Sequence, residues 1–188
     1  THFTNIQNPF NIYLMKFVKT FESFDKPSLR YVGPNPTSDV IVTRTLDGSQ
    51  QVLLVQRDSS AKAEPNKWSI PGGFVNTSSM SGEEWLPGEE TELQAGKREI
   101  YEETGLDLSR IEDSKFKLIG VFDDKGRDPR NSDTRWVKAN SFTVEIPGDM
   151  GNDVMGMDDA QSAKWFTIEE LNQMSKSEFA FDHINRLI

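Results

Sequence analysis

Two apolar segments joined by a short polar turn constrain the fold of this chain most strongly. Residues 39–46 (DVIVTRTL) and 51–57 (QVLLVQR) flank the turn, which begins with Asp47-Gly48. Asp-Gly between apolar runs is a strong β-hairpin signal, because a two-residue hairpin turn requires positive φ angles that these residues tolerate. The sequence therefore predicts a β-hairpin near the centre of the fold.

Strand-like and helix-like segments alternate along the rest of the chain. Runs rich in β-branched and aromatic residues predict strands, whereas apolar residues three and four apart predict helices. Further strands are predicted at 67–73, 116–122, 135–146 and around 163–166. Helices are predicted at 89–104, after a capping box of Thr167 and Glu170, and at roughly 177–188. This order predicts an α/β fold with a mixed β-sheet sandwiched between α-helices.

The N-terminal segment differs in character from the remainder. Residues 11–24 place apolar side chains at helical spacing, and residues 26–38 contain three prolines. We therefore expect residues 1–36 to form a helix and an extended connector that pack on a single domain, residues 37–188.

Composition excludes several classes of function. The chain of 188 residues has no cysteine, a formal net charge of -9 and a pI near 4.8. Lack of cysteine excludes disulfides, zinc–thiolate sites and thiol catalysis. An acidic surface disfavours nucleic acid, and no apolar run approaches the ~20 residues of a membrane span. We expect a cytoplasmic monomer or homodimer with no nucleic-acid or membrane partner, which could still bind a phosphate compound through metal ions.

One predicted helix concentrates charge in six positions, with Arg98, Glu99, Glu102 and Glu103. Residues three and four apart share a helix face, and like charges at that spacing destabilise a helix by ~0.2–0.5 kcal/mol. A solvated acidic helix with an ordinary Arg–Glu pair tolerates this cost, whereas a bound cation would remove it. Magnesium prefers oxygen ligands of this kind.

The spacing around these glutamates resembles the Nudix box of the Nudix hydrolase family. That pattern is G-x5-E-x7-R-E-U-x-E-E-x-G-U, with U apolar, and every fixed position from Glu90 to Leu106 matches it. The departure is that sixteen residues, 74–89, separate Gly73 from Glu90 where the family has five. Extra length in a loop costs little free energy, so we expect the helix to survive this insertion of eleven residues.

The resemblance implies a Nudix fold and cleavage of nucleoside diphosphates linked to another moiety. It implies Mg²⁺ as cofactor, which Mn²⁺ can replace. The implied catalytic residues are Arg98, Glu99, Glu102 and Glu103, and the implied metal ligands are Glu90, Glu99, Glu102 and Glu103. Arg98 would orient one carboxylate, that of Glu90 or Glu102. Asp158 and Asp159 lie where many members carry an extra carboxylate, although the pair also suits an ordinary turn.

A second stretch, residues 123–136 (DDKGRDPRNSDTRW), gathers basic residues in an otherwise acidic chain. The guanidinium fork of arginine suits phosphate, whereas Asp and Asn suit ribose hydroxyls. The alternative is an exposed mixed-charge turn. Arg57, which ends a predicted strand, could likewise reach a phosphate or lie free on the surface.

This stretch, with GPNPTSDVIVTR and DDAQSAKW, resembles mitochondrial-type ADP-ribose pyrophosphatases and the related domain of an ADP-ribose-gated channel. The resemblance implies hydrolysis of a small nucleotide, ADP-ribose, to AMP and ribose 5-phosphate. The expected substrate-binding residues are Arg57, Gly73, Asp128, Arg130, Asn131 and Asp133. Two alternatives remain: a Nudix hydrolase of NADH, a nucleotide sugar or a dinucleoside polyphosphate, and a module that senses ADP-ribose without turnover. The intact glutamates favour catalysis.

Overall fold

The computed structural model of the protein describes residues 29–187. The helix predicted at 11–24 lies outside the described residues, and the boundary predicted at residue 36 stays a prediction. No helix among residues 29–187 combines the length and apolarity needed to cross a membrane.

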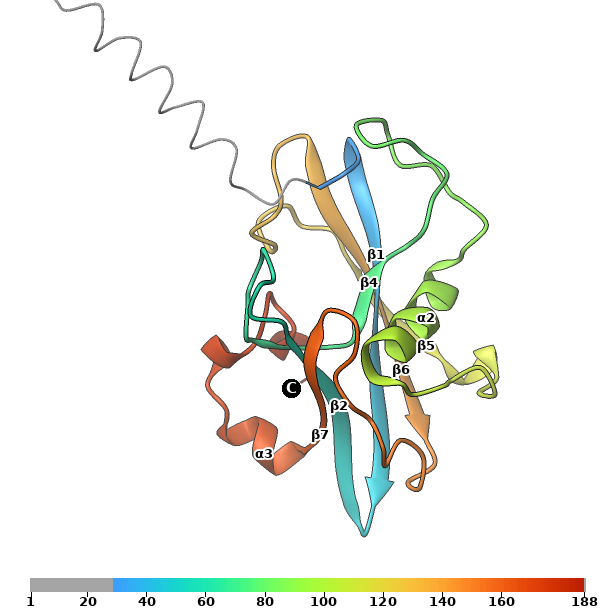
Figure 1. The fold of residues 1–188 in the computed structure, drawn as a ribbon, viewed down its shortest axis with the longest axis vertical. Coiled ribbons are helices and arrows are strands. Elements are labelled where there is room, and N and C mark those ends of the chain that lie inside the picture. Colours follow the sequence, from blue (N-terminus) through green and yellow to red (C-terminus); the bar gives the residue numbers. More distant parts are fainter. Residues whose placement is uncertain (1–28, 188) are drawn as a thin grey trace, which may run out of the picture.

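A mixed sheet of seven strands forms the centre of the molecule (Figure 1). The strands are β1 (Gly33–Leu46), β2 (Ser49–Arg57), β3 (Trp68–Ser69), β4 (Gly72–Phe74), β5 (Lys117–Phe122), β6 (Arg135–Ile146) and β7 (Ala160–Thr167). The main order is β3-β2-β1-β6-β5, with β4 paired to β1 and β7 paired to β2. Only the β1–β6 pair is parallel among these strands. The predicted mixed-sheet α/β fold is confirmed.

The predicted hairpin connects β1 and β2. Leu46 pairs with Ser49, and Asp47 and Gly48 have φ angles of 50° and 79°. Positive φ at both central residues matches the right-handed twist of the two strands, so the turn sets their register.

Strand β1 is longer than predicted because its prolines face away from β6. The carbonyl of Pro36 accepts a hydrogen bond from the N–H of Val75, on the β4 side of the strand. A residue's N–H and carbonyl point to the same side, so the missing N–H of Pro36 leaves the ladder to β6 intact. The segment 33–38, expected to be a connector, is therefore paired.

Helix α2 (Glu92–Thr104) begins three residues later than predicted. The Thr91 side chain accepts a hydrogen bond from the N–H of Gln94, whose side chain accepts from Thr91 in return. This capping box excludes Glu89 and Glu90 from the helix. The helix ends as expected at Gly105, with a φ of 73°.

Apolar side chains cover both faces of the sheet. On one face Val40, Val42 and Leu53 pack with Ile100 of α2. On the other face the alternating residues of β1 and β2 pack with the C-terminal elements. These elements are α3 (Ile168–Gln173), a short 3-10 turn (Lys176–Glu178) and α4 (Ile184–Leu187). The sheet thus lies between helices, as Figure 1 shows.

The C-terminal helix predicted at 177–188 was wrong. The chain forms the 3-10 turn and the four-residue α4 in its place, with Phe181 between them at a φ of 54°. A left-handed residue cannot continue a right-handed helix. The capping box of Thr167 and Glu170, by contrast, begins α3 as predicted.

His183 makes folding depend on pH. It is buried, and its Nδ1 accepts a hydrogen bond from the N–H of Ile70 at 2.9 Å. Burial lowers the pKa of His183 well below its usual value, and the charge of Arg186 lowers it further, whereas Asp182 opposes the shift. As the pH falls, His183 therefore becomes protonated near pH 6.5 in the unfolded state but stays neutral in the folded state until the pH is much lower.

We predict that this contribution to stability is present above pH 6.5 and is lost as the pH falls. His183→Asn keeps an acceptor near Ile70 but does not titrate. Urea unfolding at pH 7 and pH 5.5 should show that wild type loses more stability than the variant, by up to ~1.4 kcal/mol per pH unit. Equal losses in the two proteins would contradict a neutral buried histidine.

Candidate active site

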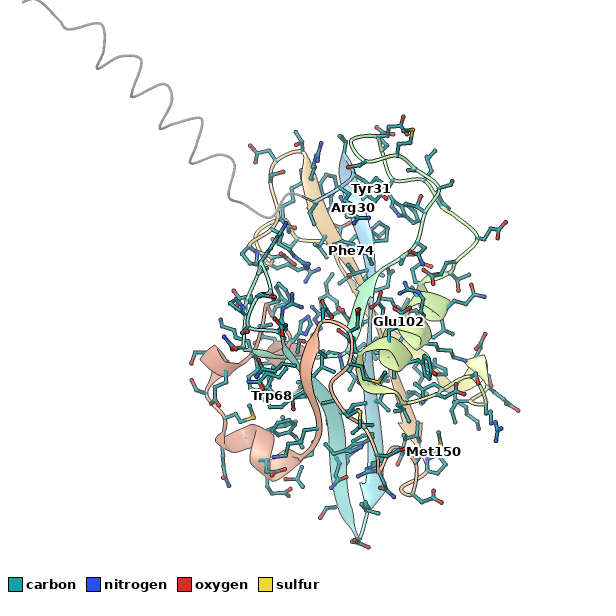
Figure 2. The ribbon with its side chains drawn as sticks, viewed as in Figure 1. Arg30, Tyr31, Trp68, Phe74, Glu102 and Met150 are labelled. Carbon is teal, nitrogen blue, oxygen red and sulfur yellow. The ribbon has the colours of Figure 1, made fainter. Side chains whose placement is uncertain are left out.

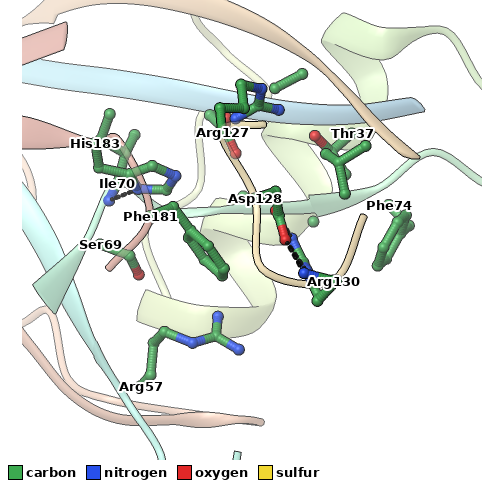
Figure 3. Close-up of a pocket in the computed structure, with 15 residues that line it drawn as sticks. Thr37, Arg57, Ser69, Ile70, Phe74, Arg127, Asp128, Arg130, Phe181 and His183 are labelled. Atoms are coloured by element: carbon green, nitrogen blue, oxygen red, sulfur yellow. Dashed lines mark hydrogen bonds and ion pairs between the residues drawn. The ribbon is translucent and has the colours of Figure 1, made fainter. Parts of the chain in front are cut away.

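A cleft of about 530 Å³ lies between α2, β4, the start of β1 and the loop before β7. Figure 2 shows the region, with Tyr31, Phe74 and Glu102 labelled. The cleft is lined by acidic groups, including Glu99, Glu103 and Asp159, and also by Arg57 and Arg130. A smaller pocket of about 40 Å³ shares Arg57, Arg130 and β4 with it (Figure 3).

Strand β4 brings the helix close to the cleft floor because it lacks side chains at two positions. A Cβ atom on Gly73 would overlap the carboxylate of Glu99. Gly72 has a φ of 156° and its N–H donates to Glu103 Oε2 at 2.9 Å. Glycine at these positions allows backbone and carboxylates to meet. Gly73, a predicted substrate-binding residue, lines the cleft.

Arg98 holds three of the predicted glutamates. Its Nε and Nη2 donate to Glu90 at 2.8 and 3.1 Å. Its Nη1 donates to Glu99 at 2.7 Å and to Glu102 at 2.8 Å. Its Nη2 also donates to the carbonyl of Phe74 at 3.0 Å. Both partners predicted for Arg98, Glu90 and Glu102, are therefore bound to it, and the group ties α2 to β4.

Burial disfavours the charged forms of both Glu103 and Glu99. Glu103 is 5% exposed, and burial raises its pKa well above the usual value, with repulsion from Asp159 and Glu99 adding to the effect. Burial also raises the pKa of Glu99, against the opposing effect of Arg98. Desolvated carboxylates of this kind favour a nearby cation.

The donor chemistry fits a hard divalent cation. Glu99 and Glu103 present oxygen atoms to the cleft, which is the ligand type that Mg²⁺ and Mn²⁺ prefer. Within residues 29–187, however, no group of three or more His, Cys, Asp or Glu side chains already converges on one point. The reason is visible in the hydrogen bonds: Glu90, Glu99 and Glu102 all turn toward Arg98.

The extra carboxylates reach the same cleft. Asp158 and Asp159 both line it, from the loop before β7, which is hydrogen-bonded to the end of α2 through Met157 and Glu103. Asp158 has a φ of 50°, and the carbonyl of Asp159 accepts from the N–H of Asp58 at 3.1 Å. The ordinary turn that the sequence also suggested for this pair is present, and both residues of the turn line the cleft.

The loop after β5 contributes a buried ion pair. Asp128 is 4% exposed and accepts from Arg130 Nε at 3.0 Å and from Nη2 at 2.7 Å. Although burial opposes it, this pairing holds the pKa of Asp128 below its usual value. Both oxygens of the Asp128 carboxylate are therefore bonded to Arg130, and Arg130 lines the cleft.

Asn131 and Asp133 lie outside the residues that line the two pockets. The Asn131 side chain accepts from the N–H of Val137 at 2.8 Å and donates to the carbonyl of Lys125 at 3.1 Å. Asp133 is exposed, and its carbonyl accepts from Lys125. These contacts shape the loop, so we leave both residues out of the proposed site.

Arg57 lies at the end of β2 and lines both pockets. Its Nε donates to the carbonyl of Ala63 at 3.0 Å. Burial lowers the pKa of Arg57, and the positive charge of Arg130 lowers it further. The alternative of a free surface arginine does not describe this residue.

The inserted loop forms an outer wall that sequence reasoning missed. The N–H of Gly82 donates to the carbonyl of Arg30, and the N–H of Val32 donates to that of Glu83, both at 2.8 Å. The Asn35 side chain holds the backbone of Tyr31 through bonds of 3.0 and 2.8 Å. Arg30, Tyr31 and Phe74 thereby line the cleft. Their pairing with a distant loop has no local sequence signal.

Comparison with known proteins identifies the family. Residues 35–187 match the NUDIX domain, so the chain belongs to the Nudix family. The m7GpppN-mRNA hydrolase NUDT17 of Danio rerio is 39% identical over 75 residues, which cover 40% of this chain and 21% of that protein. The ADPR responsive transcriptional repressor NtrR of Acinetobacter baylyi is 25% identical over 167 residues, 89% of this chain and 55% of that protein. The chain thus spans only part of these relatives.

Solved structures share the fold. The NUDIX domain of Shewanella oneidensis NrtR, complexed with ADP ribose, has a TM-score of 0.62 at 19% identity, covering 90% of this chain and 93% of that one. A bifunctional NMN adenylyltransferase/ADP ribose pyrophosphatase from Francisella tularensis, complexed with AMP and a Mn ion, has a TM-score of 0.64 at 22% identity. It covers 94% of this chain and 45% of that one. Family membership supports hydrolase chemistry for the chain.

We predict that Mg²⁺ stabilises the folded protein through Glu103. Titrating Mg²⁺ into metal-free protein should raise the melting temperature, as any ligand that binds only the native state does. Glu103→Gln should remove most of this rise. In metal-free buffer the variant should melt at or above the wild-type temperature, because a poorly compensated buried charge is gone.

Glu92→Gln, in the first turn of the same helix, is the matched control and should keep the full response to Mg²⁺. A full response in Glu103→Gln would exclude Glu103 as a ligand.

Proposed function

We propose that the protein is a Mg²⁺-dependent pyrophosphatase, with Mn²⁺ able to substitute, that hydrolyses ADP-ribose to AMP and ribose 5-phosphate. The observation that carries this proposal is one cleft lined by both the desolvated carboxylates of α2 and two arginines, Arg57 and Arg130. A diphosphate with bound metal ions complements both sets of charges.

The reaction adds one water to the diphosphate. A bond forms between the water oxygen and one phosphorus, the bond from that phosphorus to the bridging oxygen breaks, and a proton is released to solvent. A divalent cation, when bound, neutralises phosphate oxygens and lowers the pKa of a coordinated water. Glu99 and Glu103 are positioned to hold it, and Glu102, with a side chain 42% exposed, can turn to it from Arg98.

The remaining residues position the reacting groups. Glu90 binds two nitrogens of Arg98, which in turn directs Glu99, so we assign Glu90 a positioning role beside its proposed part in metal binding. Asp158 or Asp159 supplies the extra carboxylate from the loop before β7. Asp128 acts through Arg130, which with Arg57 binds the phosphates.

ADP-ribose is favoured as substrate by two arguments. The segments around 33–44, 128–136 and 158–165 resemble ADP-ribose pyrophosphatases. The Acinetobacter relative, which matches 89% of this chain, is by name responsive to ADPR. Assignment to the mitochondrial-type subgroup and a cytoplasmic location stay predictions.

A second candidate is an ADP-ribose-binding module without turnover. The observation that favours it is the same relative, which is a transcriptional repressor. For this reason the expected lack of a nucleic-acid partner also stays a prediction. Buried Glu103 weighs against a purely sensing role, because binding of the nucleotide alone does not require a desolvated carboxylate.

We predict that ADP-ribose has the highest kcat/KM in a panel with NADH, a nucleotide sugar and a dinucleoside polyphosphate, assayed with Mg²⁺. Chromatography should resolve AMP and ribose 5-phosphate as products. Glu103→Gln should lower kcat at least about a hundredfold, because a metal ligand contributes several kcal/mol to charge stabilisation. ADP-ribose that binds tightly without products would establish the sensor. A better substrate elsewhere in the panel would overturn the ADP-ribose assignment.

We predict that Asp128 and Arg130 behave as one unit. Arg130→Ala should lower kcat/KM for ADP-ribose roughly tenfold to a hundredfold, and Arg130→Lys should restore little because an ammonium lacks the planar fork. Asp128→Ala should cause a similar loss, and the double variant should be no worse than Arg130→Ala alone. Additive losses would mean that Asp128 contacts the substrate independently.

A further inference from the structure

Phe181 lies between the two arginines of the cleft. The Cζ atom of Arg130 is 4.7 Å from the centre of the Phe181 ring, and that of Arg57 is 5.2 Å from it. Figure 3 shows the ring projecting from the C-terminal segment toward both side chains. All three residues line the smaller pocket.

We propose that Phe181 is a positioning residue that sets the spacing of Arg57 and Arg130, so that the two guanidinium groups form a two-point clamp for a diphosphate. The proposal rests on the proposed function for the identity of the full substrate. It adds the C-terminal segment, which the Nudix box does not include, to the residues that recognise the diphosphate.

Two arginines that face one cleft repel each other, so each needs an attractive contact that keeps it in place. Arg130 has a carboxylate partner in Asp128, whereas the only hydrogen bond that the guanidinium of Arg57 makes within the described residues goes to the carbonyl of Ala63. The face of an aromatic ring attracts a guanidinium, and one ring in contact with two such groups can hold both. Phe181 supplies that attraction without neutralising the charges that a diphosphate needs.

The backbone of Phe181 is strained in a way that points to function. Its φ of 54° is unusual for a bulky side chain, and strain of this kind persists only where the surroundings enforce it. Both neighbours in the chain are held: the N–H of Ala180 donates to the carbonyl of Trp68 at 2.8 Å, and Asp182 pairs with Arg127 and Arg186. The ring is thus delivered to the arginines from a rigid segment.

Packing in the core does not explain this residue. The nearby Phe179 and Ile184 belong to the buried cluster on this face of the sheet, whereas Phe181 is half-buried and outside it. Its ring touches one buried side chain, His183, with ring centroids 5.3 Å apart, but it belongs to no apolar cluster, so its strained conformation is better explained by its contacts in the cleft.

The experiment compares Phe181→Leu, Phe181→Tyr and Phe181→Gly with wild type in the full chain. The first measurement is the Kd of methylenediphosphonate, a diphosphate that cannot be hydrolysed, by calorimetry with Mg²⁺. The second is KM and kcat for ADP-ribose, and the third is the melting temperature. Phe122→Leu is the matched control, because Phe122 also lies under an arginine, Arg186, at 4.6 Å but lines neither pocket.

Phe181→Leu and Phe181→Gly should raise Kd and KM about tenfold and change kcat less than about twofold, as expected when binding is lost equally from ground and transition states. Phe181→Tyr keeps the ring and should restore both constants. Glycine suits a positive φ, so Phe181→Gly should weaken binding without a matching loss of melting temperature. Phe122→Leu should leave Kd unchanged.

Two results would overturn the clamp: a wild-type Kd in Phe181→Leu, or a loss in Phe181→Gly that Phe122→Leu reproduces. Failure of the proposed function gives a different pattern. If wild type binds methylenediphosphonate in a Phe181-dependent way but leaves ADP-ribose intact, the clamp stands and the ADP-ribose pyrophosphatase assignment falls.

Discussion

Five hydrogen bonds from the guanidinium of Arg98 join the acidic side of α2 to β4 and to the loop before the helix. Without the guanidinium of Arg98, three unpaired negative charges would lie near the buried Glu103, namely those of Glu90, Glu99 and Glu102. The hydrogen bonds that Arg98 donates to Glu90 are the largest cause of the raised pKa of Arg98. The Arg98 side chain is 27% exposed, so each pair contributes only about 1 kcal/mol or less. Its main effect is geometric, because it holds Glu99 over Gly73.

The cleft places two sets of desolvated charged groups within reach of one ligand. Burial raises the pKa of Glu99 and Glu103, which disfavours their charged forms. Burial and the neighbouring Arg130 lower the pKa of Arg57. Each group would be more stable in water, and each is relieved by a ligand of the opposite charge. A diphosphate with a divalent cation would relieve both, which links the desolvation of these groups to the proposed chemistry.

Much of the fold follows from local patterns. The Asp47-Gly48 turn, the Thr167–Glu170 capping box and the Gly105 cap depend on backbone preferences within a few residues, and each occurs where predicted. Helix α2 begins at Glu92 and not at Glu89 as predicted, because Thr91 caps the helix with its side chain although the glutamates before it are compatible with a helix. In the site, the helical spacing of Arg98 and the glutamates placed them together, because a helix converts sequence spacing directly into proximity.

The sequence by itself determined the central hairpin and the acidic helix, since both depend on contacts between residues close in the chain. It also determined the match to the Nudix box, which is a matter of spacing alone. Only the tertiary structure decided which charges pair across the cleft. Asp128 binds Arg130 because burial leaves it no water, and the insertion pairs with residues 30–32 from a distant part of the chain. Phe181 interrupts the predicted C-terminal helix because Trp68, Arg127 and Arg186 hold its neighbours. These arrangements depend on desolvation and on partners far apart in sequence, which local propensity does not encode.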